Sequence, residues 1–152
     1  MSHQMSSAHI VWVNYEAEDP SLVPVYQTEG SSGCDLRSAE DITIEPGKRA
    51  VVSTGLKIEL PAGFEAQIRP RSGLALKHGV TVLNSPGTID TDYRGLIKVI
   101  LLNTGDAPFI ISKGDRIAQM VFSEFNRCVF LKSETLSSTQ RGEGGFGSTG
   151  KS

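Results

Sequence analysis

The sequence predicts an all-β barrel or sandwich made of short strands, with one short helix over Ser72–His78. Leu56, Ile58 and Leu60 alternate with polar residues, as they do in a strand with one buried face. Similar short runs, rich in apolar and β-branched residues, recur along the chain at spacings typical of all-β domains. Turn signals built on Pro and Gly separate these runs, which favours short strands joined by tight connections.

The expected strands follow from these runs in chain order. They cover residues 11–13, 42–44, 50–53, 56–60, 65–68, 81–83, 96–102, 109–111 and 117–122. The turns fall at residues 45–48, 61–63, 85–87 and 112–115, and each of them contains glycine. No internal repeat is evident, so one barrel or sandwich accounts for all of the runs.

The run 96–102 is apolar except for Lys98. A continuous apolar run of this length is consistent with a strand that is covered on both faces. A domain of 152 residues has few places where a strand can be covered twice, and a second subunit would supply one. The sequence therefore predicts a homo-oligomer.

Length and composition indicate one globular domain of 152 residues, 38% hydrophobic and 21% charged. The net charge is −2 and the pI about 5.9, so the chain lacks the basic field that binds duplex nucleic acid. No apolar run approaches the ~20 residues that span a membrane, and residues 1–9 lack a signal-peptide core. Cys34 and Cys128 match no zinc or redox spacing, which favours reduced thiols. We therefore expect a cytoplasmic protein that binds neither nucleic acid nor membranes.

The segment 87–95 concentrates functional chemistry between two glycines. It contains Asp90, Asp92, Tyr93 and Arg94, whereas a turn requires glycine but not this density of carboxylate, ring and guanidinium groups. We interpret it as a site on a rigid hairpin in which one Asp acts as a base. For Asp92 the alternative is an anchor that accepts backbone N–H bonds, the commoner role of Asp in a turn.

Three further polar segments are candidates for the same site. Residues 69–75 combine arginine, a hydroxyl and exposed N–H groups at a helix start, which suits phosphate; a solvated turn explains them equally well. Asp35 is a candidate partner for an arginine, or an outer-shell metal group. Gln119, on the strand after the turn at 112–115, could point into a site.

Residues 137–152 cannot build a core, because they are mostly Gly, Ser, Thr and charged residues. Such a tail is usually a disordered end. A flap over a ligand is the alternative, since Phe146 is suited to stacking and Arg141 to binding an anion. The tail also satisfies GxGxxG at 142–147 and the P-loop pattern at 145–152. Both patterns require a following helix, which this sequence does not contain, so we set them aside.

Five segments in order resemble the five motifs of the trimeric dUTP pyrophosphatases (dUTPases). They are Gly33-Cys34-Asp35-Leu36, Pro70-Arg71-Ser72-Gly73-Leu74-Ala75, residues 87–95, Gly114-Asp115-Arg116-Ile117-Ala118-Gln119 and Arg141-Gly142-Glu143-Gly144-Gly145-Phe146-Gly147-Ser148. Any one of them is a weak signal, but five at family-like spacing are specific, and the resemblance extends from about Val23 to the end. Cys34 departs from the family pattern, where a bulkier residue such as Tyr or Leu is common, and this implies only a packing difference.

The resemblance implies a jelly-roll-like β-barrel that forms a homotrimer with shared active sites. Residues 1–136 would form the barrel, with 1–9 flexible, and residues 137–152 a flap that closes a neighbouring active site. The implied reaction is hydrolysis of dUTP to dUMP and pyrophosphate by Mg2+-assisted attack of water on the α-phosphate. This reaction keeps uracil out of DNA and supplies dUMP for thymidylate synthesis.

The resemblance also implies a role for each matched residue. Asp90 would be the general base, and Tyr93 would pack against the deoxyribose and leave no room for a 2′-hydroxyl. The uracil edge would be read by Asn84, Gly87, Thr88, Ile89 and Lys98, and the phosphates held by Arg71, Ser72, Gly73 and Gln119. Phe146 would stack on uracil, while Arg141, Gly147 and Ser148 would clamp the distal phosphates. Mg2+ would be held by phosphate oxygens and waters, with Asp35 at most in its outer shell.

Three alternatives are considered beside this hypothesis. A dCTP deaminase of similar fold would need a glutamate to activate water at the cytosine ring, and Glu124, Glu134 and Glu143 lie outside the hairpin segment. A nucleotide-sensing trimer would bind nucleotide without turnover. A purely structural β-sandwich would leave the Arg-Ser-Gly cluster and the flap without a purpose.

Overall fold

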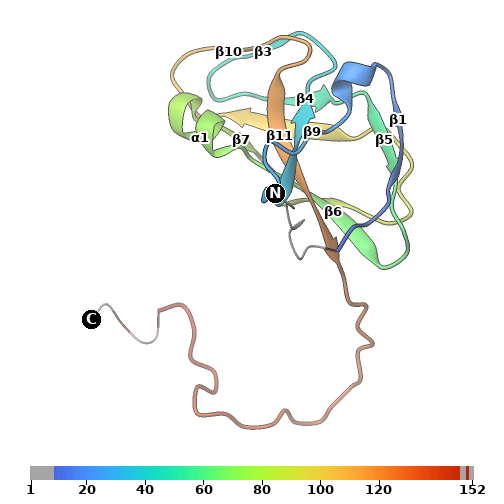
Figure 1. The fold of residues 1–152 in the computed structure, drawn as a ribbon. Coiled ribbons are helices and arrows are strands. Elements are labelled where there is room, and N and C mark those ends of the chain that lie inside the picture. Colours follow the sequence, from blue (N-terminus) through green and yellow to red (C-terminus); the bar gives the residue numbers. More distant parts are fainter. Residues whose placement is uncertain (1–8, 148–149, 151–152) are drawn as a thin grey trace, which may run out of the picture.

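The computed structural model describes residues 9–147 and 150, and these form a barrel of antiparallel strands with a long C-terminal tail (Figure 1). Within these residues the strands are β1 (Asn14–Ala17), β2 (Gly33–Arg37), β3 (Ile42–Ile44), β4 (Arg49–Ser53), β5 (Leu56–Glu59), β6 (Phe64–Arg69), β7 (Val80–Val82), β8 (Gly87–Ile89), β9 (Lys98–Asn103), β10 (Phe109–Ile111) and β11 (Arg116–Glu124). The helices are a 3₁₀ turn, η1 (Pro20–Leu22), and α1 (Ser72–His78). The predicted all-β fold with one short α-helix is confirmed.

Four small antiparallel sheets enclose the core. Their strand orders are β2-β11-β6-β8, β4-β9-β7, β1-β5 and β10-β3. Sheet neighbours are mostly distant in the sequence: β11 lies between β2 and β6, and β9 lies between β4 and β7. These long-range pairings give the chain its jelly-roll-like connectivity and bring motif segments onto neighbouring strands.

Alternating side chains fill the barrel as the period of two predicts. On β5, Leu56 and Ile58 are buried while Lys57 between them is exposed. On β9, Val99 and Leu101 are each only 1% exposed. Burying one such side chain stabilises the fold by about 1.5–3 kcal/mol relative to leaving it in water, so these inward positions fix the register of each strand.

Helix α1 has the predicted bounds, Ser72–His78. It ends at Gly79, whose left-handed φ of 68° lets its N–H return to the carbonyl of Ala75. Lys77 and His78 lie in the last turn, where positive charge suits the helix dipole. The end of this helix is therefore specified by local sequence.

Most of the predicted strands are confirmed. The runs 42–44 and 109–111 have the bounds of β3 and β10, and those at 50–53, 56–60, 65–68, 81–83 and 117–122 agree with β4, β5, β6, β7 and β11 to within two residues. The run 96–102 becomes a strand only at Lys98. Directly before Lys98, the Ile97 N–H donates to the Leu56 carbonyl, and the Ile97 carbonyl accepts from the Thr54 N–H. These two bonds hold the start of the run against the segment 54–56.

The strand predicted at residues 11–13 is wrong. The first strand is β1, which pairs with β5 and places Tyr15 opposite Ile58. Its sequence, Asn-Tyr-Glu-Ala, is mostly exposed, so a search for apolar runs does not find it. The sequence also gives no strand signal for β2 or β8, because glycine and charged residues in those motif segments indicate turns.

Strand β9 is fully covered on one face only. Val99 and Leu101 are buried, whereas Ile100 and Leu102 on the opposite face are half-buried. The single chain therefore covers the second face only in part, and the homo-oligomer predicted from this run stays a prediction.

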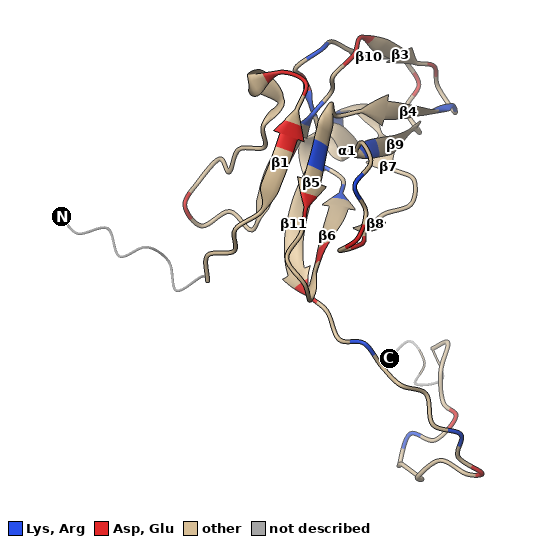
Figure 2. Cartoon of the chain, turned by 90° about the vertical axis from the view of Figure 1, so that its right-hand side faces the viewer, with Lys and Arg blue, Asp and Glu red and all other residues tan. Residues whose placement is uncertain are grey.

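Acidic and basic residues are interspersed over the barrel (Figure 2). On the two-stranded sheet, Glu16 of β1 lies opposite Lys57 of β5, and such opposite-charge neighbours contribute about 0.2–1 kcal/mol. Within residues 9–147 and 150, no helix is long and apolar enough to span a membrane.

The chain leaves the barrel after β11. From residue 125 to 147 the described residues form neither strand nor helix, and the tail runs away from the barrel (Figure 1). Val129, Phe130 and Leu131 in this tail are 82%, 95% and 86% exposed. Residues 1–8, 148–149 and 151–152 lie outside the described part of the chain, so the flexibility predicted for residues 1–9 and the domain boundary at 136/137 stay predictions.

Candidate active site

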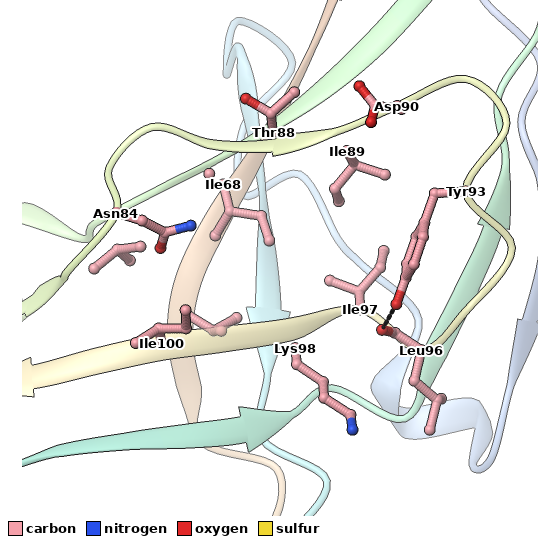
Figure 3. A pocket seen from close by; sticks show the side chains of 13 residues that line it. Ile68, Asn84, Thr88, Ile89, Asp90, Tyr93, Leu96, Ile97, Lys98 and Ile100 are labelled. Atoms are coloured by element: carbon pink, nitrogen blue, oxygen red, sulfur yellow. Dashed lines mark hydrogen bonds between the residues drawn. The ribbon is translucent and has the colours of Figure 1, made fainter.

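A cavity of about 210 Å³ opens between β8, with the turn that follows it, and β9 (Figure 3). Its lining residues are Ile68, Val82, Asn84, Gly87, Thr88, Ile89, Asp90, Tyr93, Leu96, Ile97, Lys98, Val99 and Ile100. The structure thus brings together the residues that were predicted to contact the base and the sugar, which are Asn84, Gly87, Thr88, Ile89, Asp90, Tyr93 and Lys98.

The cavity has an apolar interior and a polar rim. Ile68, Ile89 and Val99 are buried at its inner side. Asn84 and Lys98 are exposed at its edge, and Figure 3 shows the Asn84 amide lying between the β8 segment and β9. An apolar slot with a few polar groups at its edge suits a flat ring that carries hydrogen-bonding groups on its rim.

Strand β8 approaches its neighbour β6 closely at Gly87. Gly87 lies opposite Ile68 in the register, and a Cβ added to Gly87 would lie only 3.3 Å from the Ile68 Cβ. The missing side chain leaves the main chain of β8 at the cavity wall. Backbone N–H and C=O groups are therefore available there for hydrogen bonds to a ligand.

Hydrogen bonds hold the turn after β8. The Thr91 hydroxyl donates to the Phe64 carbonyl at 2.6 Å, and one nitrogen of Arg94 donates to the carbonyls of Thr91 at 2.7 Å and Tyr93 at 3.2 Å. The Tyr93 N–H donates to the Asp90 carbonyl at 3.1 Å. These bonds fix the main chain that follows Asp90, and the pairing of β8 with β6 holds the residues before it.

The Tyr93 ring spans the gap between the turn and the chain that leads into β9 (Figure 3). Its hydroxyl donates to the Leu96 carbonyl at 2.8 Å, and the residue is 45% exposed. One side of the ring is therefore held by the protein while the other remains open to a ligand.

Both acidic side chains of the turn are exposed. Asp90 lines the cavity, which is the placement that a base acting on a bound substrate requires. Asp92 is exposed as well but is not a cavity residue. Within the described residues, Thr91 and Arg94 hold the turn through side-chain hydrogen bonds, and the anchoring role considered for Asp92 stays a prediction.

A second cluster is centred on the buried carboxylate of Asp35, on β2. Gln27 donates to its Oδ2 at 2.7 Å, the Arg116 guanidinium lies 3.5 Å from the same oxygen, and Arg71 Nε lies 3.9 Å from Oδ1. Arg71 also donates to the Arg116 carbonyl at 3.0 Å. Of the two roles considered for Asp35, the structure shows the arginine partner.

The other predicted phosphate ligands lie beside this cluster. Arg71 is the N-cap residue directly before α1, and Ser72 and Gly73 are exposed in the first turn of the helix. The Gln119 amide donates to the Pro70 carbonyl at 2.9 Å, directly before Arg71. Gln119 therefore holds the loop that carries Arg71, and its contact with the phosphates stays a prediction.

The cavity and the Asp35 cluster use opposite faces of one sheet. Asp35, Gln119 and Arg69 share a register position on β2, β11 and β6, so their side chains lie on one face. Ile68, which directly precedes Arg69 on β6, points to the other face and lines the cavity. Arg71, Ser72, Gly73 and Gln119 are not among the cavity's lining residues. A single described chain thus presents the two halves of the predicted site separately.

The described part of the tail, which carries Arg141, Phe146 and Gly147, runs away from the barrel (Figure 1). Phe146 is fully exposed, and Arg141 donates to the Gly144 carbonyl at 2.7 Å within a local turn. Gly147 has a left-handed φ of 79°. Ser148 lies outside the described residues.

Cys34 neighbours Asp35 but faces the core. It is 2% exposed, its thiol donates to the Met120 carbonyl, and burial raises the pKa of the thiol to about 11. Burial likewise raises the pKa of Tyr26. The cysteine fills space behind the cluster, as its position in the motif suggested, and stays protonated at neutral pH.

No group of three or more His, Cys, Asp or Glu side chains is placed to hold a metal ion within residues 9–147 and 150. Both oxygens of Asp35 already face positively polarised partners. How Mg2+ would be held therefore stays a prediction.

Sequence reasoning did not identify Gln27, Thr91, Arg94 or Arg116 as functional residues. Arg94 and Arg116 lie inside the quoted motifs, so their position was a usable signal. Nothing in the sequence connects Gln27 with Asp35, because the contact depends on the bridge between Val25 and Asp35.

Comparisons with known proteins agree with this arrangement. The family model dUTPase matches residues 19–150. Proteins named deoxyuridine 5′-triphosphate nucleotidohydrolase are similar over most of the chain: that of Hydrogenobaculum sp. is 61% identical over 88% of this chain and 92% of its own. That of Chlamydia pneumoniae is 56% identical over 90% of this chain and 97% of its own.

Solved structures are similar in fold. The dUTPase of Streptococcus mutans is 30% identical, with a TM-score of 0.72, over 76% of this chain and 98% of its own. A mutant dUTPase of Staphylococcus bacteriophage 80alpha, solved with dUpNHpp, has a TM-score of 0.84 at 24% identity over 92% of this chain and 99% of its own. A mutant dUTPase of phage phi11 of S. aureus, described with a structural Mg(II) ion, has a TM-score of 0.76 at 20% identity over 84% of this chain and 99% of its own.

Proposed function

The chain belongs to the dUTPase family, and from this premise we propose that the cavity between β8 and β9 is where it binds the nucleoside of dUTP. The protein hydrolyses dUTP to dUMP and pyrophosphate. The observation that supports the location is the convergence of seven matched residues on one cavity. The activity keeps uracil out of DNA and supplies dUMP for thymidylate synthesis.

Asp90 is the proposed general base. Its carboxylate is exposed at the cavity edge, and the bonds of Thr91 and Arg94 hold the main chain beside it. Asp90 would orient a water molecule and accept its proton as the water oxygen attacks the α-phosphorus. The bond to the bridging oxygen then breaks, and the β- and γ-phosphates leave as pyrophosphate.

The main chain of β8 is the proposed reader of uracil, together with Asn84 and Lys98. Backbone N–H and C=O groups distinguish the N3–H donor and O4 acceptor of uracil from the reversed pattern of cytosine, because the mismatch leaves buried polar groups unpaired. The slot between β8 and β9 is proposed to be too narrow for the 5-methyl group of thymine. Thr88 and Ile89 belong to the same wall.

Tyr93 is the proposed wall for the sugar. The hydrogen bond to Leu96 holds its ring upright beside the cavity. A ring fixed in this way packs against C2′ of a deoxyribose and leaves no space for the 2′-hydroxyl of a ribose.

The triphosphate is proposed to lie along Arg71, Ser72, Gly73 and Gln119 of one subunit. Arg71 is oriented by Asp35, which is itself held by Gln27 and Arg116. Phe146 of the flap would stack on the uracil, and Arg141, Gly147 and Ser148 would contact the distal phosphates. The flap is proposed to comprise residues 137–152 and the barrel domain residues 1–136.

Mg2+ is the proposed cofactor. When bound to the triphosphate it neutralises phosphate charge and fixes the conformation of the chain of phosphates. Within the described residues the protein offers no direct ligand set, so phosphate oxygens and waters would supply the coordination, with Asp35 at most in the outer shell.

A homotrimer is the proposed assembly, and the cytoplasm the proposed location. The separation of the cavity, the Asp35 cluster and the tail in one chain supports sites that combine residues from different subunits. The half-buried Ile100 and Leu102 on β9 also support additional cover from another subunit.

Substrate specificity is the test of this proposal. Phosphate release is measured with dUTP, dTTP, dCTP and UTP in the presence of Mg2+, with inorganic pyrophosphatase as the reporter enzyme. We expect turnover of dUTP alone. Equal turnover of all four nucleotides would contradict the uracil and deoxyribose assignments, and binding of dUTP without turnover would contradict the base assignment.

A further inference from the structure

The Tyr93 ring lies directly over Gly95. A Cβ added to Gly95 would lie 2.5 Å from the Tyr93 hydroxyl oxygen and 2.7 Å from Cζ, the ring carbon that bears it. Contacts this short do not occur between real atoms, so a side chain at position 95 and the observed Tyr93 ring exclude one another.

The requirement for glycine at this position is steric. Gly95 is not among the glycines with positive φ, which include Gly79 and Gly114. Alanine can therefore adopt the backbone conformation of residue 95. The obstacle to a side chain there is the Tyr93 ring, which occupies the space. The three heavy atoms nearest to the added Cβ all belong to Tyr93, so the closest conflict is with one side chain.

The bond from Tyr93 to Leu96 depends on the same space. The hydroxyl reaches the Leu96 carbonyl at 2.8 Å across residue 95, and Leu96 and Tyr93 both line the cavity. If a methyl group displaces the ring, the hydroxyl loses this acceptor and the ring is free to turn outward, since it is already 45% exposed.

From this geometry we infer that Gly95 is a positioning residue that sets sugar specificity through Tyr93. The inference rests on the sugar role of Tyr93 in the proposed function. By leaving space under the ring, Gly95 allows Tyr93 to stand at the one place where it blocks a 2′-hydroxyl. A side chain at position 95 moves this wall and opens the site to ribonucleotides.

The test is the ratio of kcat/KM for dUTP to kcat/KM for UTP. We expect Gly95→Ala to lower this ratio by about tenfold or more, because discrimination by a well-placed contact is lost. The melting temperature should change little, because the colliding atoms are the end of an exposed side chain. Gly30→Ala is the matched control, since a Cβ there meets nothing within 4 Å and Gly30 has no positive φ; its ratio should equal that of the unmodified protein.

A double-mutant cycle with Tyr93→Ala separates action through the ring from other effects. If Gly95 acts through Tyr93, the Gly95→Ala substitution has no further effect on the ratio once the ring is absent. The inference is overturned if Gly95→Ala lowers the dUTP/UTP ratio equally with and without the Tyr93 ring. It is also overturned if Gly95→Ala leaves the ratio unchanged while Tyr93→Ala lowers it. Should Gly95→Ala impair folding, recovery of the melting temperature in the double variant supports the collision, and no recovery overturns it.

Failure of the proposed function gives a different result. A Tyr93→Ala protein that retains full preference for dUTP over UTP would contradict the sugar role of Tyr93 itself, and the inference with it. The effect of Gly95→Ala is interpreted only against a Tyr93→Ala protein that has lost this preference.

Discussion

Asp90 owes its position to neighbours that carry no catalytic chemistry. The carboxylate is exposed, so its orientation depends on the main chain of the turn, which Thr91 and Arg94 fix through hydrogen bonds to Phe64, Thr91 and Tyr93 carbonyls. An exposed base on a rigid turn can reach a substrate without the cost of burying an unpaired charge.

Asp90→Asn tests the base assignment. The amide keeps the size and polarity of the side chain but cannot accept a proton, so we expect kcat to fall by roughly 10²–10⁴-fold while affinity for a non-hydrolysable dUTP analogue is retained. Steady-state kinetics and calorimetric titration measure the two quantities. Asp92→Asn is the matched control and should retain turnover; the opposite pattern would assign the base to Asp92.

Cys34 illustrates a motif residue whose role is packing. Burial raises the pKa of its thiol to about 11, and the thiolate is the reactive form. We therefore expect Cys34 to resist alkylation at pH 8 in the folded protein and to react after unfolding in denaturant. Mass spectrometry of a Cys128→Ser variant isolates this thiol, and rapid alkylation of the folded variant would show that Cys34 is accessible.

At the scale of elements, the sheet β2-β11-β6-β8 organises the site. Its pairing places Asp35 beside Gln119 and Arg69 on one face, and Ile68 beside Gly87 at the cavity. One β-sheet thus carries both the Asp35 cluster and one wall of the cavity, and the side-chain alternation of β6 separates them.

Strand β9 joins the core to the cavity and should dominate stability. Leu101→Ala removes a side chain that is 1% exposed, so we expect a loss of about 2–5 kcal/mol in the free energy of unfolding. Leu76→Ala is the control, because Leu76 is 87% exposed, and surface changes usually stay within about 0.5 kcal/mol. Urea unfolding at one fixed protein concentration compares them, and equal losses would contradict the assigned core.

The C-terminal tail is an element without secondary structure in the described residues. Deleting residues 141–152 should abolish most turnover because Arg141 and Phe146 are lost, while the barrel keeps its melting temperature. Kinetics and thermal unfolding followed by circular dichroism test this. Deleting only residues 151–152 is the control and should leave turnover intact; full activity in the longer deletion would contradict the flap role.

At the scale of the whole molecule, one chain lacks a complete site. The residues of the Asp35 cluster are not among the cavity's lining residues, and the described part of the tail runs away from the barrel (Figure 1). A symmetric assembly solves this problem, because each chain can donate one part to each of several sites.

Light scattering after size-exclusion chromatography should give three times the 16.3 kDa of one chain. Mixed trimers test whether sites are shared: Asp90→Asn chains refolded together with chains lacking residues 141–152 should recover part of the activity that each lacks alone. Recovery follows because an intact Asp90 from one chain and an intact flap from another then meet in one site. A 16.3 kDa particle, or no recovery in mixed trimers, would contradict shared sites.

Local sequence patterns were enough to predict the strand-rich fold, helix α1 and seven of the residues that line the cavity. These patterns are local properties of the sequence. Alternating apolar residues form strands because every second side chain is buried, and glycines mark turns because they adopt the αL conformation. The family followed from the same local patterns.

Only the tertiary structure decided which residues meet across the chain. Three features depend on strand register and turn geometry. They are the hydrogen bond from Gln27 to Asp35, the hydrogen bond from Gln119 to Pro70 and the space between Gly95 and the Tyr93 ring. The exposed strand β1 likewise exists because β5 offers it an edge to pair with. Such contacts leave no periodic signal in a sequence, since they depend on three-dimensional packing and not on local spacing.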